Sequence, residues 1–315
     1  MKPEAELSVV LPQPAAWTGE FPSRPISLEQ ARQYCESLAR NHYENFPVAT
    51  FLLPRRLRPH FFSVYAYCRW ADDLGDEVGD RSRSLALLQR WEEELLACYQ
   101  GQARHPVFVA LRETIQQCEI PPEPFRDLLA AFRMDQTKTR YQTFAEVLEY
   151  CRYSANPVGR LVLYVCGYRD PERQQLSDFT CTALQLANFW QDVRRDYQIG
   201  RIYIPLEDMA RRGYSEDDLR AGRYDERFAN LLRELVERTG DLFQQGLPLV
   251  SRVDRRLAMD IELFSRGGME VLRQIERQNY NVLARRPCLD SNAKALLLAS
   301  VVARRIFSRK SEPRA

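Results

Sequence analysis

Histidine and glycine are scarce in this chain of 315 residues, which has 3 His and 13 Gly. So few glycines leave little material for phosphate-binding loops or for many tight turns. The 8 cysteines form no C-x-x-C pair and show no zinc-type spacing with histidine, which favours a reduced protein over a disulfide-stapled or zinc-bound one. None of His42, His60 and His105 lies in a catalytic signature. If this protein carries out chemistry at a charged site, carboxylates and arginines are therefore the side chains available for it.

Excess charge and long apolar runs are also absent. The 45 Lys+Arg nearly balance the 43 Asp+Glu, which argues against a nucleic-acid partner. The most apolar stretch, Ala295–Ala303, is far shorter than the roughly 20 residues of a membrane span. The N-terminus does not read as a signal peptide. We expect a cytoplasmic protein, and an apolar fraction of 45% is enough to fold it.

The apolar residues recur with helical period almost everywhere after Ile26, and no alternating strand pattern stands out. We therefore expect one all-α domain over residues 26–308, preceded by a flexible Pro-rich leader (1–25) and followed by a basic tail (309–315). Capping boxes at Ser27/Gln30 and Thr143/Glu146 mark two helix starts. Further helices are expected at Pro59–Glu77, Ser84–Tyr99, from Pro106 onward, at Pro124–Met134 and at 173–197. The helix that begins at Thr143 should bend at Pro157, and Arg201–Pro205 should be extended. The region from Asp225 to Phe307 is expected to be helical, with interruptions at Gly246–Pro248, Gly267–Gly268 and Pro287.

Two acidic clusters continue apolar helix faces instead of opposing them. Asp72 and Asp76 are spaced i, i+4, so they share a face with Cys68 and Tyr65. In the second cluster, Asn188, Asp192 and Asp196 lie within an arc of about 80° on one helix. Acidic runs on helices are ordinarily solvated surface, and that remains the simpler interpretation of each cluster taken alone.

Inward carboxylates on two helices would repel one another unless a cation lay between them. At an effective dielectric near 20, unit charges about 4 Å apart interact by about 4 kcal/mol, against a total stability of about 5–15 kcal/mol. Oxygen-only ligands suit a hard ion such as Mg²⁺, which completes its shell with water and phosphate oxygens. The pattern thus predicts Mg²⁺ ions bridging to a diphosphate.

These segments resemble the squalene/phytoene synthase family of all-α isoprenoid synthases. The resemblance runs from about Asn41 to Arg286 and is carried by Asn45–Pro54, Tyr65–Asp76, Tyr150–Gly159, Gln185–Asp196 and Gly200–Pro205. It implies a single-domain helical bundle with a central active-site cavity and a prenyl diphosphate as substrate.

The resemblance also assigns roles to individual residues. It implies metal ligands at Asp72, Asp76, Asn188, Asp192 and Asp196, and a tyrosine near the carbocation at Tyr153. It implies substrate-binding groups at Arg69, Gln185, Asn188, Arg201 and Tyr203. Structural alternatives are a salt bridge from Arg69 to Asp73 and a core position for Tyr153. Tyr280 and Arg285 or Arg286 resemble a C-terminal contact segment, in which Tyr280 is expected to pack.

Departures from the family pattern point to one branch. The chain has Tyr43–Phe46 where head-to-head synthases commonly carry Ser-x-Ser-Phe, and Ser154–Gly159 where Val-Ala-Gly-x-Val-Gly is common. Both changes are similar to the bacterial hydroxysqualene synthase branch of hopanoid pathways. The implied reaction is Mg²⁺-assisted ionisation of presqualene diphosphate, rearrangement within walls such as Phe61, Tyr65, Tyr153, Phe189 and Trp190, and capture by water.

Two other functions stay open. An enzyme of the same fold could condense farnesyl diphosphate or another prenyl diphosphate to presqualene diphosphate, squalene or phytoene. A helical scaffold without catalysis is the alternative of another class. Contact with the inner membrane surface through the apolar and basic region Ala293–Lys310 is a further expectation, weighed against a terminal core helix. Association with other squalene-pathway enzymes would be compatible with either.

Overall fold

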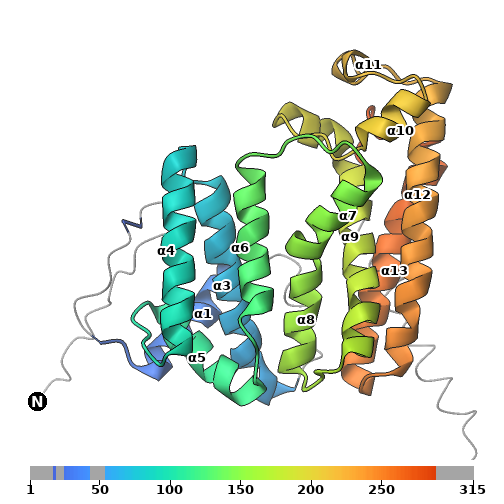
Figure 1. Cartoon of the computed structure of the whole chain (residues 1–315). Helices are drawn as coiled ribbons and strands as arrows, with labels where there is room; N and C mark the ends of the chain where they lie inside the picture. Colours follow the sequence, from blue (N-terminus) through green and yellow to red (C-terminus); the bar gives the residue numbers. More distant parts are fainter. Residues whose placement is uncertain (1–16, 19–24, 43–53, 289–315) are drawn as a thin grey trace, which may run out of the picture.

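The computed structural model describes residues 17–18, 25–42 and 54–288, and within these ranges it is helical without a strand (Figure 1). The predicted all-α fold is therefore confirmed. The elements are α1 (Leu28–His42), η2 (Arg55–Leu57), α3 (Arg58–Asp76), α4 (Arg81–Tyr99), α5 (Pro106–Cys118), α6 (Glu123–Asp135), α7 (Phe144–Ser154), α8 (Asn156–Val165), α9 (Pro171–Gln198), α10 (Leu206–Arg211), α11 (Glu216–Arg220), α12 (Glu226–Gly246), η3 (Leu247–Ser251) and α13 (Arg255–Arg277).

Local sequence sets the helix starts as predicted. Gln30 N–H donates to Ser27 Oγ (3.2 Å), and Ser27 N–H donates back to Gln30 Oε1 (3.0 Å), which is the capping box expected there. Thr143 Oγ1 accepts from Glu146 N–H (3.2 Å) at the start of α7. Each of these contacts satisfies backbone N–H groups that have no partner within the helix.

Three predicted elements differ from the structure. The helix expected to bend at Pro157 is two helices: α7 ends at Ser154, Ala155 lies between the two with a φ of −115°, and Pro157 occupies the first turn of α8. The Gly267–Gly268 pair does not interrupt α13, which runs through it. Residues 278–288 are not helical, since Asn279 and Tyr280 adopt left-handed φ angles of 50° and 64° that end α13.

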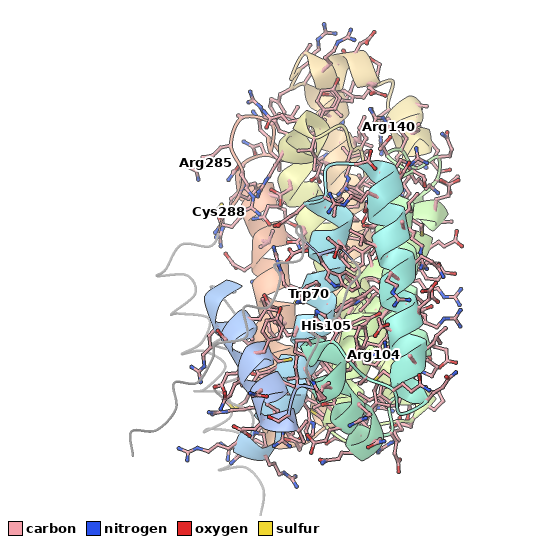
Figure 2. All side chains as sticks on the ribbon, turned by 90° about the vertical axis from the view of Figure 1, so that its left-hand side faces the viewer. Trp70, Arg104, His105, Arg140, Arg285 and Cys288 are labelled. Atoms are coloured by element: carbon pink, nitrogen blue, oxygen red, sulfur yellow. The ribbon has the colours of Figure 1, made fainter. Side chains whose placement is uncertain are left out.

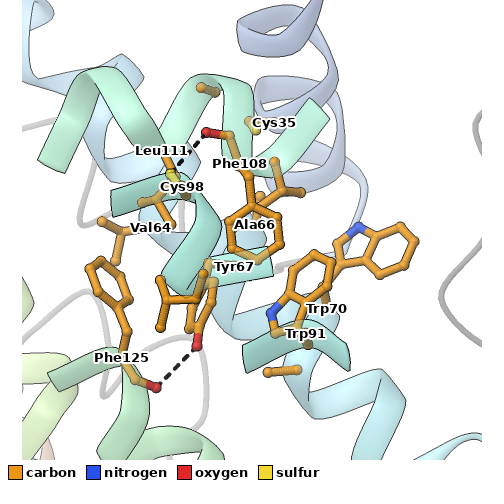
Figure 3. Close-up of a cluster of buried hydrophobic side chains, with 14 of the residues drawn as sticks. Cys35, Val64, Ala66, Tyr67, Trp70, Trp91, Cys98, Phe108, Leu111 and Phe125 are labelled. Atoms are coloured by element: carbon orange, nitrogen blue, oxygen red, sulfur yellow. Dashed lines mark hydrogen bonds between the residues drawn. The ribbon is translucent and has the colours of Figure 1, made fainter. Parts of the chain in front are cut away.

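The interior consists of two hydrophobic cores. The first gathers α1, α3, α4 and α5, with Trp70 stacked on Trp91 (ring centroids 5.2 Å apart) among the side chains drawn in Figure 3. Figure 2 labels Trp70 and His105 inside the bundle, where their rings lie 4.4 Å apart. The second core gathers α7, α9, α12 and α13. The two acidic motifs therefore belong to different cores, α3 to the first and α9 to the second.

Trp17 departs from the predicted flexible leader. Its side chain is 1% exposed and meets the rings of Trp70 and Trp91 edge-on at 5.8 and 5.6 Å. Edge-to-face contacts at these distances are favourable and add to burial of the indole. This part of the leader therefore belongs to the first core.

Helix α9 packs against α7, α8, α12 and α13 (Figure 1). Glycines on three of those neighbours permit the approach. A Cβ on Gly159 would lie 2.5 Å from Cys181 Sγ, and one on Gly268 would lie 2.9 Å from Leu184 Cδ2. A Cβ on Gly246 would lie 3.0 Å from the Thr180 backbone nitrogen. The glycine at 268 thus serves close packing inside a continuous helix, which explains why it does not end α13.

No helix in the described ranges is both long enough and apolar enough to cross a bilayer. The basic C-terminal region Ala293–Lys310 and the diagnostic segment Tyr43–Phe46 lie outside the described residues.

Candidate active site

A cleft of about 600 Å³ opens between the two cores. Helices α3, α6, α7, α8 and α9 form its walls together with the extended segment after α9 and Arg286 near the end of the described chain. Nine of the ten residues predicted from sequence line it: Arg69, Asp72, Asp76, Gln185, Asn188, Asp192, Asp196, Arg201 and Tyr203.

The α3 wall presents Asp72 and Asp76 near the C-terminal end of the helix, as their i, i+4 spacing predicts. Arg69, one turn earlier, lines the cleft and pairs with Asp72 (3.3 Å), Glu77 (3.1 Å) and the buried Asp73. The salt bridge from Arg69 to Asp73 and the position of Arg69 in the cleft are therefore both present.

The α9 wall presents Gln185, Asn188, Asp192 and Asp196 along successive turns. Asp192 is paired with Arg286, whose Nη2 donates to Asp192 Oδ2 at 2.9 Å. Sequence spacing alone does not place Arg286 here, 94 residues away from Asp192.

Two contacts to α9 hold the segment that carries Arg286. Arg194 Nη1 donates to the Leu283 carbonyl oxygen (2.8 Å), and Gln191 Nε2 donates to the Pro287 carbonyl oxygen. The helix that supplies the acidic motif thus also holds the arginine that pairs with it.

The segment Arg201–Pro205 is extended, as predicted, and contributes Arg201 and Tyr203 to the lining of the cleft. Ile202 N–H donates to the Thr139 carbonyl oxygen (2.9 Å), which fixes its backbone. Arg201 Nη2 reaches Asp76 Oδ1 on the opposite wall (3.4 Å). Tyr203 is buried with its ring stacked on Phe189, the centroids lying 3.7 Å apart.

Burial and like charges raise the pKa of several cleft carboxyls. Desolvation, followed by the Asp76 carboxylate, raises the pKa of Asp72 to about 6. Desolvation, followed by the Asp192 carboxylate, raises the pKa of Asp196 to about 7. Burial and neighbouring carboxylates thus favour the protonated forms of Asp72 and Asp196.

Asp135 is a cleft residue that the sequence reasoning missed. It ends α6, accepts a hydrogen bond from the Tyr150 hydroxyl (3.0 Å), and its Oδ1 is buried without a partner. Desolvation raises its pKa to about 6, while Arg201 acts in the opposite direction. A signal was present: Leu128, Phe132 and Asp135 are spaced i, i+4, i+7 and all line the cleft.

Some residues expected at the wall lie elsewhere. Tyr153 does not line the cleft, whereas Tyr150, three residues earlier on α7, does. Trp190 is fully buried in the second core and donates to Thr239 Oγ1 (2.7 Å). Tyr280 packs against the second core, as expected for it.

A second, mainly apolar pocket of about 430 Å³ adjoins the cleft, and Tyr65 and Val158 line both. Its walls come from α3, α8, α9, η3 and α13, including the predicted wall residue Phe61. A charged cleft continuous with an apolar pocket suits an amphiphile with an anionic head and a hydrocarbon tail.

The described residues contain no converging group of three or more His, Cys, Asp or Glu that would form a ready metal cluster. Carboxylates of the two motifs pair with Arg69 on the same helix and with Arg201 and Arg286 from other segments. Their donor set is nevertheless suited to a hard cation, since it consists of carboxylate and amide oxygens.

Comparison with known proteins places this geometry in a family. The family model "Squalene/phytoene synthase" matches residues 39–292. Hydroxysqualene synthase from Rhodopseudomonas palustris is 36% identical over 239 residues, covering 75% of this chain and 80% of its own. The 15-cis-phytoene synthase from Synechocystis sp. is 31% identical over 313 residues, covering 94% and 90%.

A solved structure agrees with these relatives. The crystal structure of squalene synthase HpnC from Alicyclobacillus acidocaldarius superimposes with a TM-score of 0.78 and 47% identity, covering 82% of this chain and 97% of that one. A dehydrosqualene synthase in complex with ligand gives 0.80 at 26% identity, covering 89% and 98%. With both acidic motifs on one cleft and a family model matched over most of its length, this chain belongs to the squalene/phytoene synthase family.

Proposed function

We propose that this enzyme converts presqualene diphosphate and water into hydroxysqualene, diphosphate and a proton, with Mg²⁺ as its cofactor. One observation carries the proposal: two acidic helix faces and three arginines line a cleft that continues into an apolar pocket. The cleft accommodates the diphosphate and the pocket accommodates hydrocarbon.

The arginines bind and hold the leaving group. Arg69, Arg201 and Arg286 each line the cleft next to a motif carboxylate, so a diphosphate entering between them meets guanidinium groups from three different segments. Guanidinium groups fixed in position favour the state in which negative charge has moved onto the departing diphosphate.

The motif residues Asp72, Asp76, Asn188, Asp192 and Asp196 would hold Mg²⁺. Carboxylate and amide oxygens are the donors that Mg²⁺ takes, and the raised pKa values of Asp72 and Asp196 reflect burial and like charges that a cation would offset. When bound, Mg²⁺ supplies positive charge that makes diphosphate a better leaving group.

The cyclopropylcarbinyl cation left by ionisation rearranges beside aromatic faces. Tyr65 and Phe189 line the cleft, and Tyr203 covers Phe189. Their π-faces favour a cation without offering it a nucleophile. Water then forms a carbon–oxygen bond and loses a proton, which gives the alcohol.

The relatives support this branch of the family. Hydroxysqualene synthases from Rhodopseudomonas palustris and Sinorhizobium fredii are 36% and 37% identical to this chain. The 15-cis-phytoene synthase of Synechocystis sp., at 31% identity over 94% of this chain, supports the alternative of head-to-head condensation. A catalytically inactive scaffold has no comparable support, because the lining of the cleft retains both acidic motifs.

Product analysis separates these functions. Purified enzyme with Mg²⁺ is offered farnesyl diphosphate and presqualene diphosphate in separate reactions, and the products are identified by mass spectrometry. We expect hydroxysqualene from presqualene diphosphate alone, and no turnover by the Asp192→Asn variant. Conversion of farnesyl diphosphate with presqualene diphosphate left untouched would overturn the proposal in favour of condensation.

A further inference from the structure

One carboxylate lines the apolar pocket among the residues that the structure describes, and it belongs to Asp260 of α13. Its neighbours in the lining are mainly apolar and include Leu257, Ile261 and Phe264. Asp260 is 5% exposed, and its Oδ1 is buried without a hydrogen-bond partner. A buried carboxyl oxygen without a partner is costly, so its position at the wall of a hydrocarbon pocket needs a reason.

Asp260 lies at the end of the pocket remote from the cleft. On α9 the cleft begins at Gln185, whereas the pocket reaches back to Ser177, which is about 12 Å earlier at 1.5 Å per residue. Helix α13 runs alongside α9 in the same direction. Gly246, which precedes α13 in the chain, lies next to Thr180 of α9, whereas Gly268 within α13 lies next to Leu184, one turn further along α9. Asp260 precedes Gly268 by two turns and therefore lies at the level of the far end.

Other acidic side chains of this region have structural partners. Glu262, also on α13, pairs with Arg266 (2.8 Å), and Asp178 of α9 pairs with Arg160 (2.6 Å). Asp254 caps α13 by accepting from Arg256 N–H (2.9 Å). The Asp260 Oδ1 atom has no equivalent contact, so helix capping and ion pairing do not account for it.

The Asp260 carboxyl is more stable next to a polar group than next to hydrocarbon. Desolvation, with a smaller contribution from Asp254, raises the pKa of Asp260 to about 7. A hydrocarbon group pressed against it would remove its remaining hydration in either protonation state, at a free-energy cost. A chain that ends short of Asp260 avoids that cost, whereas a longer chain incurs it.

We propose that Asp260 is a specificity-determining residue that limits the length of the prenyl chain admitted to the pocket. The inference rests on the proposed function in one respect, namely that a prenyl chain occupies this pocket. It predicts a preference for C15-derived over C20-derived chains that depends on a polar side chain at position 260.

Binding measurements test the inference independently of turnover. Unreactive farnesyl and geranylgeranyl thiolodiphosphates are titrated with Mg²⁺ into wild type, Asp260→Leu and Asp260→Asn by isothermal calorimetry. We expect the wild type to prefer the farnesyl compound, and Asp260→Leu to reduce that preference about tenfold by binding the longer chain more tightly. Asp260→Asn keeps a polar group and should retain most of the preference.

Glu262→Gln is the matched control, because it removes a carboxylate from the same helix outside the pocket lining. It should leave the ratio of the two dissociation constants unchanged. An unchanged ratio in a folded Asp260→Leu protein, as judged by circular dichroism, would overturn the inference, as would an equal shift in Glu262→Gln. Failure of the wild type to convert presqualene diphosphate would instead reject the proposed function, while the binding ratio still decides the role of Asp260.

Discussion

At the scale of single residues, the most informative side chains are carboxyls without a full set of partners. Asp135 and Asp260 each bury an oxygen that accepts no hydrogen bond, and burial raises the pKa of both. Asp135 faces the charged cleft, whereas Asp260 faces the apolar pocket. The same chemical feature therefore leads to different expectations at the two positions.

Asp135→Asn should lower kcat/KM for presqualene diphosphate about tenfold to a hundredfold, the usual effect of losing a group that orients a site's ligands. The amide keeps the volume but removes the negative charge that interacts with Arg201. Steady-state kinetics measure the loss. Asp127→Asn, on the same helix but not in the cleft lining, is the control; similar losses in both variants would argue against a role for Asp135 in the cleft.

The stability of Asp260→Asn relative to wild type should be higher at pH 8 than at pH 5. The folded-state pKa of Asp260 is about 7, against about 3.9 in an unfolded chain. As pH rises from about 4 to 7, the unfolded chain releases this proton while the folded chain retains it. Wild type therefore loses stability through that window, and Asn, which does not titrate, does not. Thermal unfolding at the two pH values measures the difference, and an equal offset at both would contradict it.

At the scale of elements, α9 is the helix on which the site depends, since it supplies one wall of the cleft and one wall of the pocket. Its close contacts with α8, α12 and α13 require glycine at the points of approach. A side chain there would displace α9 and with it Asn188, Asp192 and Asp196.

Gly246→Ala should lower the free energy of unfolding by about 1–3 kcal/mol, because the new Cβ would lie 3.0 Å from the Thr180 backbone nitrogen and 3.2 Å from the Leu176 carbonyl oxygen. Gly75→Ala is a matched comparison. Gly75 lies inside α3, and its Cβ would lie 3.5 Å from Phe132 of α6, which is an ordinary van der Waals contact, so we expect no loss and a gain of up to about 1 kcal/mol. Denaturant unfolding curves compare the two, and equal destabilisation would show that close packing is not the cause.

Periodicity predicted the helices that carry the motifs because their apolar faces are long. It did not predict α10 and α11, of six and five residues, which are too short for a period to emerge. The helix expected beyond α13 is interrupted at Asn279 and Tyr280, which have left-handed φ angles. Nothing in the amino-acid composition of this segment predicts that backbone conformation.

In the site, acidic residues recur at i, i+4 spacing on two helices, and this spacing together with the family resemblance predicted nine of the cleft residues. Arg286 could not be fixed, because its position depends on tertiary contacts with Arg194 and Gln191. Asp135 was missed since a single carboxylate at a helix end resembles a solvated one. The family resemblance pointed to Tyr153, but Tyr150 is the tyrosine of α7 that lines the cleft, and a resemblance in sequence does not decide which of the two faces inward.

At the scale of the whole molecule, the cleft lies between two cores that each contribute one acidic wall. Ion pairs from Arg201 to Asp76 and from Arg286 to Asp192 are among the contacts at this boundary. A ligand that binds both walls should therefore stabilise the entire fold.

Mg²⁺ with inorganic diphosphate should raise the melting temperature, and more at pH 8 than at pH 6. Raised pKa values of about 6 for Asp72 and about 7 for Asp196 mean that both carboxyls still hold protons at the lower pH. Cation binding has to displace those protons, so affinity grows as pH rises through these values. Scanning calorimetry measures the shift, and Asp192→Asn should abolish most of it. A larger shift at pH 6 would contradict the assignment.

The burial of Trp17 has a practical consequence for anyone who shortens the chain. A truncation at residue 25 would look harmless from composition, yet it would remove the indole that touches Trp70 and Trp91 and open a void of aromatic size. Loss of a buried tryptophan side chain costs about 3–5 kcal/mol in other proteins. Helices α3 and α4 would lose a packing contact that they share at Trp70 and Trp91, and Asp72 lies on the same helix as Trp70. Trp17, which is distant in sequence from both acidic motifs, thus helps to keep one of the two walls of the cleft in place.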